Sequence, residues 1–191
     1  MRSSALTLSL LIVATYGSAA GFQAAPSERQ AVAAEASPDP WKPVRFLLGE
    51  WRGTASGQPG TGTVSRRYEL VLGNRFVHER NTSTYLPRQP GKAGEVHEHW
   101  SFMSYDRAQK VIRLRQFHQE GFVNSYVLSH RASSATKLVF ESEQFENLDN
   151  AWRARETYEV VSGDEFVEIF ELAPPGKPFE VYSRNHFRRV E

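Results

Sequence analysis

Short apolar runs that alternate with polar positions dominate the middle of the sequence. Between residues 95 and 130 there are three such runs, rich in Val, Ile, Phe, Tyr and Trp, and only a few turn residues separate them. Residues of these types suit the pleated surface of a sheet, and breaks this short are typical of consecutive antiparallel hairpins. The pattern therefore predicts a β-meander in the middle of the chain.

The same pattern recurs on both sides of this meander and predicts about ten strands in all. They are expected at residues 49–57, 63–72, 75–86, 95–105, 110–118, 122–130, 136–145, 150–161, 165–172 and 179–190. A short helix is expected just before the first strand, between a proline suited to a first helical turn and a glycine suited to a helix end. Regular spacing with short turns predicts an all-β fold, an antiparallel up-and-down barrel, with a two-sheet sandwich as the alternative. Closure is favoured because an open meander would expose two strand edges.

The first twenty residues have the three parts of a secretory signal peptide: the positive Arg2, an apolar run at residues 5–16, and small residues up to Ala20. An uncleaved anchor is the alternative, although the apolar run is short for a bilayer span. Residues 21–40, rich in Ala, Ser and Pro, are expected to be a disordered spacer, so that the barrel domain occupies residues 41–191. The chain is therefore expected to be periplasmic or secreted, with no stable membrane insertion after cleavage.

Composition narrows the classes of function. The sequence has no Cys, which excludes disulfides, thiolate metal ligands and a Cys nucleophile. Its 23 Lys and Arg balance 22 Asp and Glu, so that neither a nucleic acid nor an anionic membrane is an expected partner. No phosphate-binding loop, dinucleotide-binding glycine motif or Gly-x-Ser-x-Gly motif occurs. Whether the protein is an enzyme stays open, and these absences favour a binding protein.

The central strands carry more polar side chains than a core needs, which predicts the wall of an internal pocket for a small hydrophobic or amphipathic molecule. Apolar lining is expected from aromatic residues and a polar end from basic ones. The predicted ligand-binding residues are Trp100, Arg115, Phe117, His118, Phe122, Tyr126 and Arg155. For each charged residue the alternative is exposure on the outer wall. A filled barrel that only binds other proteins is a further alternative.

Three histidines in the same strands form a second candidate site. The expected hairpin register places His97 opposite His118, and Trp100 opposite Arg115, where a cation–π contact would form. His97 and His99 are two residues apart, so they point to the same face of the strand. The set His97, His99 and His118 is then a candidate zinc or iron site. A slip of one residue in the register would separate the three.

The segment LLGEWRG, with Gly49, Trp51 and Gly53, resembles the opening of the calycin barrels, which include lipocalins, fatty-acid-binding proteins and nitrobindin-type haem barrels. Further likeness to a bacterial lipocalin-like family of unknown function lies in residues 66–80, 95–110, 114–124, 152–159 and 175–184. The resemblance implies a barrel in which Trp51 closes one end, a structural role. Nitrobindin-type barrels hold haem through a histidine late in the chain. Haem is accordingly a possible cofactor, and His186 the position for its axial ligand, unless His186 is a plain strand residue.

Redox or enzymatic activity on the same barrel is therefore the alternative function, with haem at His186 or a metal at the three histidines. Acid–base chemistry is a further option, since Glu98, Glu156 and His118 could meet inside a barrel. No spacing in the sequence requires them to meet, so ligand binding is the leading prediction.

Overall fold

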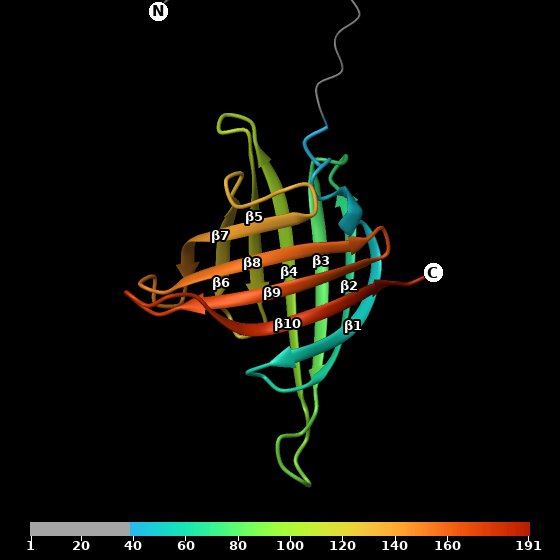
Figure 1. The fold of residues 1–191 in the computed structure, drawn as a ribbon, viewed down its shortest axis with the longest axis vertical. Helices are drawn as coiled ribbons and strands as arrows, with labels where there is room; N and C mark the ends of the chain where they lie inside the picture. Colours follow the sequence, from blue (N-terminus) through green and yellow to red (C-terminus); the bar gives the residue numbers. More distant parts are fainter. Residues whose placement is uncertain (1–38) are drawn as a thin grey trace, which may run out of the picture. The chain divides into compact units, whose positions relative to one another are not determined.

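Ten strands and one 3-10 turn make up the part of the chain that the computed structural model describes, residues 39–191 (Figure 1). The turn η1 (Arg45–Leu47) is followed by β1 (Gly49–Gly57), β2 (Gly62–Val71), β3 (Phe76–Tyr85), β4 (Glu95–Asp106), β5 (Val111–His118), β6 (Val123–Leu128), β7 (Lys137–Glu146), β8 (Arg153–Ser162), β9 (Glu165–Ala173) and β10 (Glu180–Arg189). The predicted signal peptide and nearly all of the predicted spacer lie outside the described residues.

Each strand pairs antiparallel with the next along the chain, and β10 returns to pair with β1, which closes the barrel. Figure 1 shows β10 beside β1, the two ends of the meander. The predicted all-β antiparallel barrel is confirmed, and the sandwich alternative is excluded. The observed strand ends agree with those predicted from the sequence to within a few residues. One of the larger differences is the start of β8, which was predicted at residue 150 and lies at Arg153. The described residues include no helix with the length and hydropathy of a membrane span.

The segment LLGEWRG builds the closed end of the barrel. Gly49 has a φ of +117°, a conformation that favours glycine. At Gly53 a Cβ would lie only 2.0 Å from the carbonyl oxygen of His186, so only glycine lets β1 approach β10 this closely. Between them, Trp51 is buried and donates a hydrogen bond from Nε1 to the Leu47 carbonyl oxygen at 2.6 Å. The η1 turn is thereby tied to β1.

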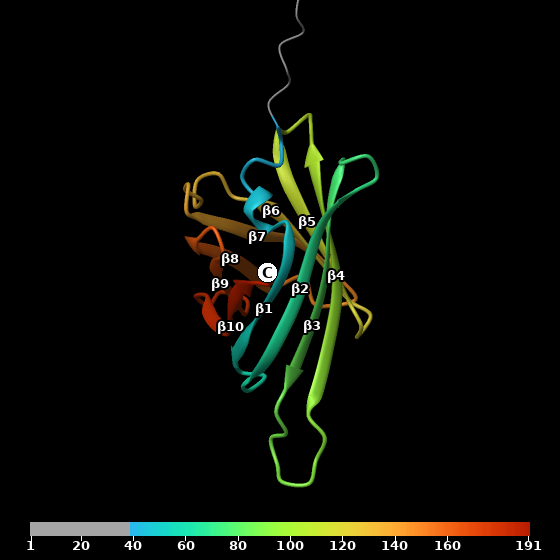
Figure 2. The same ribbon diagram turned by 90° about the vertical axis from the view of Figure 1, so that its right-hand side faces the viewer.

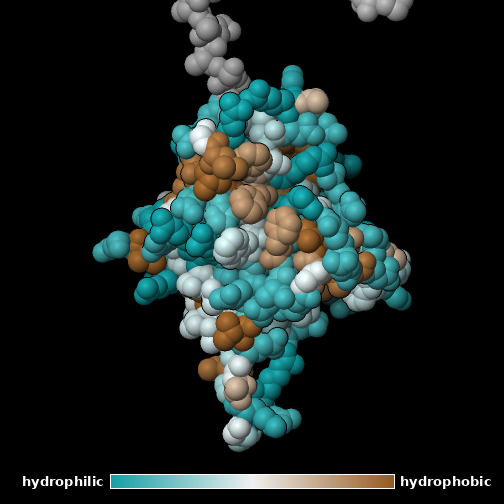
Figure 3. Space-filling view, turned by 180° about the vertical axis from the view of Figure 1, so that it is seen from behind, coloured by the Kyte–Doolittle hydropathy of each residue, from teal (hydrophilic) through white to brown (hydrophobic). Residues whose placement is uncertain are grey.

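Apolar side chains fill the interior at this end. Trp51 meets Phe166 edge to face, with ring centroids 4.7 Å apart, and Phe166 stacks on Phe187 at the same distance. Leu47, Tyr68 and other buried apolar residues belong to the same core. At the other end the long loop between β3 and β4 extends beyond the rest of the barrel (Figures 1 and 2). The outer face seen in Figure 3 is mainly hydrophilic, with apolar side chains in separate patches.

The register between β4 and β5 differs from the predicted one. His99, and not His97, lies opposite His118, and Trp100 lies opposite Phe117 instead of Arg115. The reason is the position of the turn, which lies one residue later than the predicted register requires. The Asp106 side chain accepts hydrogen bonds from the backbone N–H groups of Ala108 and Gln109, and Asp106 itself pairs with Val111, so that residues 107–110 form the connection instead of 106–109. The predicted pairs were displaced by two residues, which keeps the three histidines on a common face of the strand pair.

Candidate ligand-binding site

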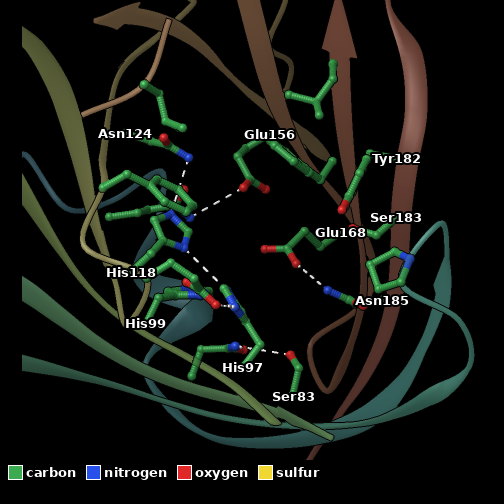
Figure 4. Close-up of a pocket in the computed structure, with 18 of the residues that line it drawn as sticks. Ser83, His97, His99, His118, Asn124, Glu156, Glu168, Tyr182, Ser183 and Asn185 are labelled. Carbon is green, nitrogen blue, oxygen red and sulfur yellow. Dashed lines mark hydrogen bonds and ion pairs between the residues drawn. The ribbon is translucent and has the colours of Figure 1, made fainter. Parts of the chain in front are cut away.

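A cavity of about 560 Å³ occupies the interior beyond the apolar core. Along the strands, inward-facing residues change from apolar to polar: on β9, Phe166 belongs to the core and Glu168 to the cavity wall. The polar part of the wall includes Arg66, His99, Gln116, His118, Asn124, Glu156, Glu168 and Asn185. An apolar and aromatic part includes Tyr85, Phe122, Phe145, Leu148, Trp152, Phe170 and Tyr182. Figure 4 shows the polar groups converging on the cavity from opposite walls.

Arg66 on β2 is the centre of the polar wall. Its guanidinium forms a two-point ion pair with Glu168, with Nη2 3.0 Å from Oε2, and Nε lies 3.0 Å from Glu79 Oε1. Asn185 donates a further hydrogen bond to Glu168 at 2.8 Å. All three charged side chains are at most 4% exposed. One buried guanidinium therefore lies beside two buried carboxylates.

The charges in this cluster change the pKa values of its members. Burial acts against the charge of Arg66, but the neighbouring Glu168 and Glu79 outweigh it and raise the Arg66 pKa well above its usual range. Burial likewise disfavours ionised Glu79, yet the Arg66 charge and the hydrogen bond from His99 lower the Glu79 pKa to about 2. Glu79 is accordingly a carboxylate at neutral pH, and the cluster carries an excess of negative charge.

Glu156 on β8 behaves in the opposite way. It is 6% exposed, and burial together with the nearby charge of Glu168 raises its pKa well above the ordinary value. Gln116 donates a hydrogen bond to its Oε1 at 3.4 Å. Glu156 therefore keeps its proton to a higher pH than an exposed glutamate does.

We expect Glu156→Gln to stabilise the protein increasingly as the pH rises above about 4.5. Because the pKa of Glu156 is higher in the folded than in the unfolded state, ionisation of this group costs the parent no stability below the unfolded-state pKa. Each further pH unit then costs the parent about 1.4 kcal/mol until the folded pKa is reached. Glutamine does not titrate, so the variant avoids this loss. Urea unfolding at pH 4, 6 and 8 measures the difference. Glu159→Gln, at a partly exposed position on the same strand with 43% of its side chain exposed, is the matched control. A difference between parent and Glu156→Gln that stays constant with pH would contradict a raised pKa of Glu156.

The three predicted histidines meet on the β4–β5 side of the cavity. His118 Nδ1 lies 3.3 Å from His97 Nε2, and His99 lies directly across the strand pair from His118. Burial and the neighbouring imidazoles of His99 and His97 lower the His118 pKa to about 2. Phe122 stacks on His118 with ring centroids 4.1 Å apart, so two of the predicted ligand-binding residues lie together on the cavity wall.

Other predicted ligand-binding residues lie elsewhere. Trp100, Arg115, Phe117 and Arg155 face the outside of the barrel, so their expected place on the cavity wall is wrong. Trp100 is 50% exposed, and the Arg80 guanidinium lies over its ring, with Cζ 4.7 Å from the centroid of the Trp100 ring. The physical reason is strand alternation, because successive side chains of a strand point to opposite faces. Residues 100, 115, 117 and 155 each stand next to an inward-facing residue, at 99, 116, 118 or 156, and therefore point outward.

Tyr126 does point inward, but it is fully buried beneath the cavity wall and accepts a hydrogen bond from Asn124 at 3.1 Å. Of the three acid–base candidates, Glu156 and His118 line the cavity, whereas Glu98 is exposed on the outer face. The structure therefore brings together two of these three groups.

His186 does not fit the role of an axial haem ligand in the interior. It lies on the outer face of β10, between the buried Asn185 and Phe187, and its Nε2 is 2.5 Å from Glu165 Oε1. A histidine that holds haem inside a barrel has to face the cavity. His186 is instead a strand residue with a carboxylate partner on β9.

The sequence reasoning missed Arg66, Glu79, Glu168 and Asn185. A signal for Arg66 was present, because it stands between Val64 and Tyr68 on the face that alternation assigns to the interior. A charged residue at an inward position is rare unless it is paired. Its partners come from β3 and β9, and no local pattern shows that they meet.

Comparisons with known proteins agree with the fold. No protein-family model matches the chain, and no curated protein does. The chain is similar in structure to Rv2717c from M. tuberculosis. That match has a TM-score of 0.61 at 14% identity and covers 81% of this chain and 99% of that one. A redesigned beta barrel matches with a TM-score of 0.37 at 10% identity over 76% of this chain and 93% of that one. Likeness to Rv2717c at this identity shows a shared barrel fold, and the finer likeness to nitrobindin-type barrels has no support here.

Proposed function

We propose that the protein binds a small amphipathic molecule inside the barrel. The mixed lining of the cavity wall supports this: it combines polar groups such as Arg66 and Glu168 with aromatic residues such as Phe122 and Trp152. A cavity of about 560 Å³ lies within the range of small-molecule sites. An amphipathic molecule would satisfy both parts of the wall, with its polar end near Arg66 and its apolar end among the aromatic side chains.

The polar end of the ligand is expected to be neutral or cationic and to donate hydrogen bonds. Arg66 supplies one positive charge to the two negative charges of Glu79 and Glu168, so an anion would meet net repulsion. Buried oxygens of Gln116 and Asn185 have no hydrogen-bond partner among residues 39–191. Donors on a ligand would satisfy these oxygens, whose burial without a partner is costly.

We also propose that binding takes place outside the cytoplasm. The support is the signal-peptide pattern of residues 1–20. The nearly even balance of acidic and basic residues supports a small-molecule partner over a nucleic acid.

A matched pair of fluorescent probes tests the proposal. Dansylcadaverine ends in an ammonium group and dansyl-aminohexanoate in a carboxylate, whereas the apolar fluorophore is the same. We expect dansyl fluorescence to rise on binding, with a dissociation constant for the ammonium probe about tenfold lower, or about 1.4 kcal/mol. No binding of either probe would count against an amphipathic ligand, and tighter binding of the carboxylate would contradict the charge argument.

Two tryptophan substitutions locate the probe. Ser83 is buried and faces the cavity, whereas its neighbour Thr84 is exposed on the same strand. Ser83→Trp should weaken probe binding at least about tenfold by filling the cavity, and Thr84→Trp should leave it unchanged. Circular dichroism verifies that both variants fold. Equal binding by the two variants would show that the probe lies outside the barrel.

A further inference from the structure

Three imidazoles meet on one wall of the cavity with the spacing of a metal site. One nitrogen from each of His97, His99 and His118 lies within 4.8 Å of the other two. The ring centroids are 5.2 to 5.9 Å apart, and Figure 4 shows the three rings gathered on the same side of the cavity. Because His99 and His118 are directly paired across β4 and β5, the arrangement is held by the backbone of the barrel.

Two of the imidazoles have a carboxylate at one ring nitrogen. His97 Nδ1 lies 2.8 Å from Glu120 Oε1, and His99 Nε2 lies 3.2 Å from Glu79 Oε1. Histidines that bind metals commonly donate their second N–H to a carboxylate, which leaves the other nitrogen with a free lone pair. That other nitrogen in His99 is Nδ1, which is buried and has no hydrogen-bond partner among the residues that the structure describes.

The third imidazole, of His118, has one nitrogen at the distance from a His97 nitrogen that two zinc ligands require. His118 Nδ1 is 3.3 Å from His97 Nε2. Two nitrogens bound tetrahedrally to zinc at about 2.0–2.1 Å are about 3.3–3.4 Å apart. The other nitrogen of His118, Nε2, faces the side-chain amide of Asn124 at 3.3 Å. Each imidazole thus has one nitrogen beside a group outside the trio and one nitrogen left for a common ion.

We propose that His97, His99 and His118 bind a divalent first-row transition metal, with Zn²⁺ as the first candidate. The carboxylates of Glu79 and Glu120 would offset part of its charge. Three protein ligands leave a fourth position, and all three histidines line the cavity, so that this position is open to a water or a small molecule inside the barrel. The site goes beyond the proposed binding of an amphipathic molecule and does not depend on it.

Metal titration of the full folded domain tests the proposal. After treatment with a chelator, Zn²⁺ is titrated calorimetrically at pH 7.5, and Co²⁺ serves as a spectroscopic probe of tetrahedral coordination by nitrogen. We expect one ion per chain with a dissociation constant below about 10 µM. We also expect visible absorption bands typical of tetrahedral Co²⁺. No binding in this range, or more than one weak site with octahedral Co²⁺ only, would overturn the proposal.

Single substitutions assign the ligands. His118→Ala and His97→Ala should each weaken Zn²⁺ binding at least about hundredfold, whereas His130→Ala, at an exposed turn position, should not change it. His97 has 26% of its side chain exposed, against 8% for His99, so its variant is decisive if another one fails to fold. Unchanged zinc affinity in the His97 variant would contradict the site. Dansylcadaverine binding is measured separately on metal-free protein, so either proposal can fail without the other.

Discussion

Replacing Arg66 by methionine is expected to lower the free energy of unfolding by about 3–5 kcal/mol. The guanidinium is the only positive partner that the structure shows for Glu79 and Glu168 within the described barrel, apart from a histidine contact to Glu79. Removal of one member of a buried ion pair leaves an uncompensated charge, which costs this amount. Urea unfolding at pH 7, followed by circular dichroism, measures the change.

Arg67→Met is the matched control, because Arg67 is the next residue on the same strand and faces the outside. Its side chain is 57% exposed and pairs with the equally exposed Glu50 at 3.1 Å. Exposed pairs contribute about 0–1 kcal/mol, so the control should lose little stability. Adding Glu79→Gln and Glu168→Gln to Arg66→Met should restore part of the loss, since the unpaired charges are then gone. Equal losses for the two arginine variants would refute a buried ion cluster.

Replacing Trp51 by alanine is expected to cost about 3–5 kcal/mol of stability, the usual range for a large aromatic residue in a core. Trp51 is 1% exposed and packs against Phe166. The change also removes the hydrogen bond to the Leu47 carbonyl oxygen and the ring beneath Arg189, whose guanidinium lies 4.2 Å from the ring centroid. The η1 turn and the last strand would both lose an attachment to β1.

Trp152→Ala provides the comparison for this second substitution. Trp152 is 40% exposed and lines the cavity, so its removal creates no closed void. We expect a stability change within about 0.5 kcal/mol, as for most surface positions. Thermal melting of both variants under identical conditions measures the two losses of stability. A loss at Trp51 as small as the loss at Trp152 would mean that η1 and Trp51 are not needed to close the barrel.

The strands and their turns could be predicted from the sequence, because alternation and turn residues are local properties. The β4–β5 turn shows where this stops. Asp106 is the last paired residue of β4, and the four-residue connection begins one residue later than the pattern alone indicated, so the predicted pairing of His97 with His118 was displaced by two residues. A displacement of two keeps side chains on their faces, which is why the three histidines still meet.

The sequence by itself determined that this chain forms about ten antiparallel strands, for which a closed barrel was favoured over a sandwich, and that one face of each strand has to be interior. The tertiary structure decided which face. Trp100 and Phe117 were expected inside because they are large and apolar, yet they lie outside beside arginines. Arg66 and Glu168 lie inside because each neutralises the other across the cavity wall. Only closure of the barrel brings these two residues together, since they are 102 positions apart in the chain.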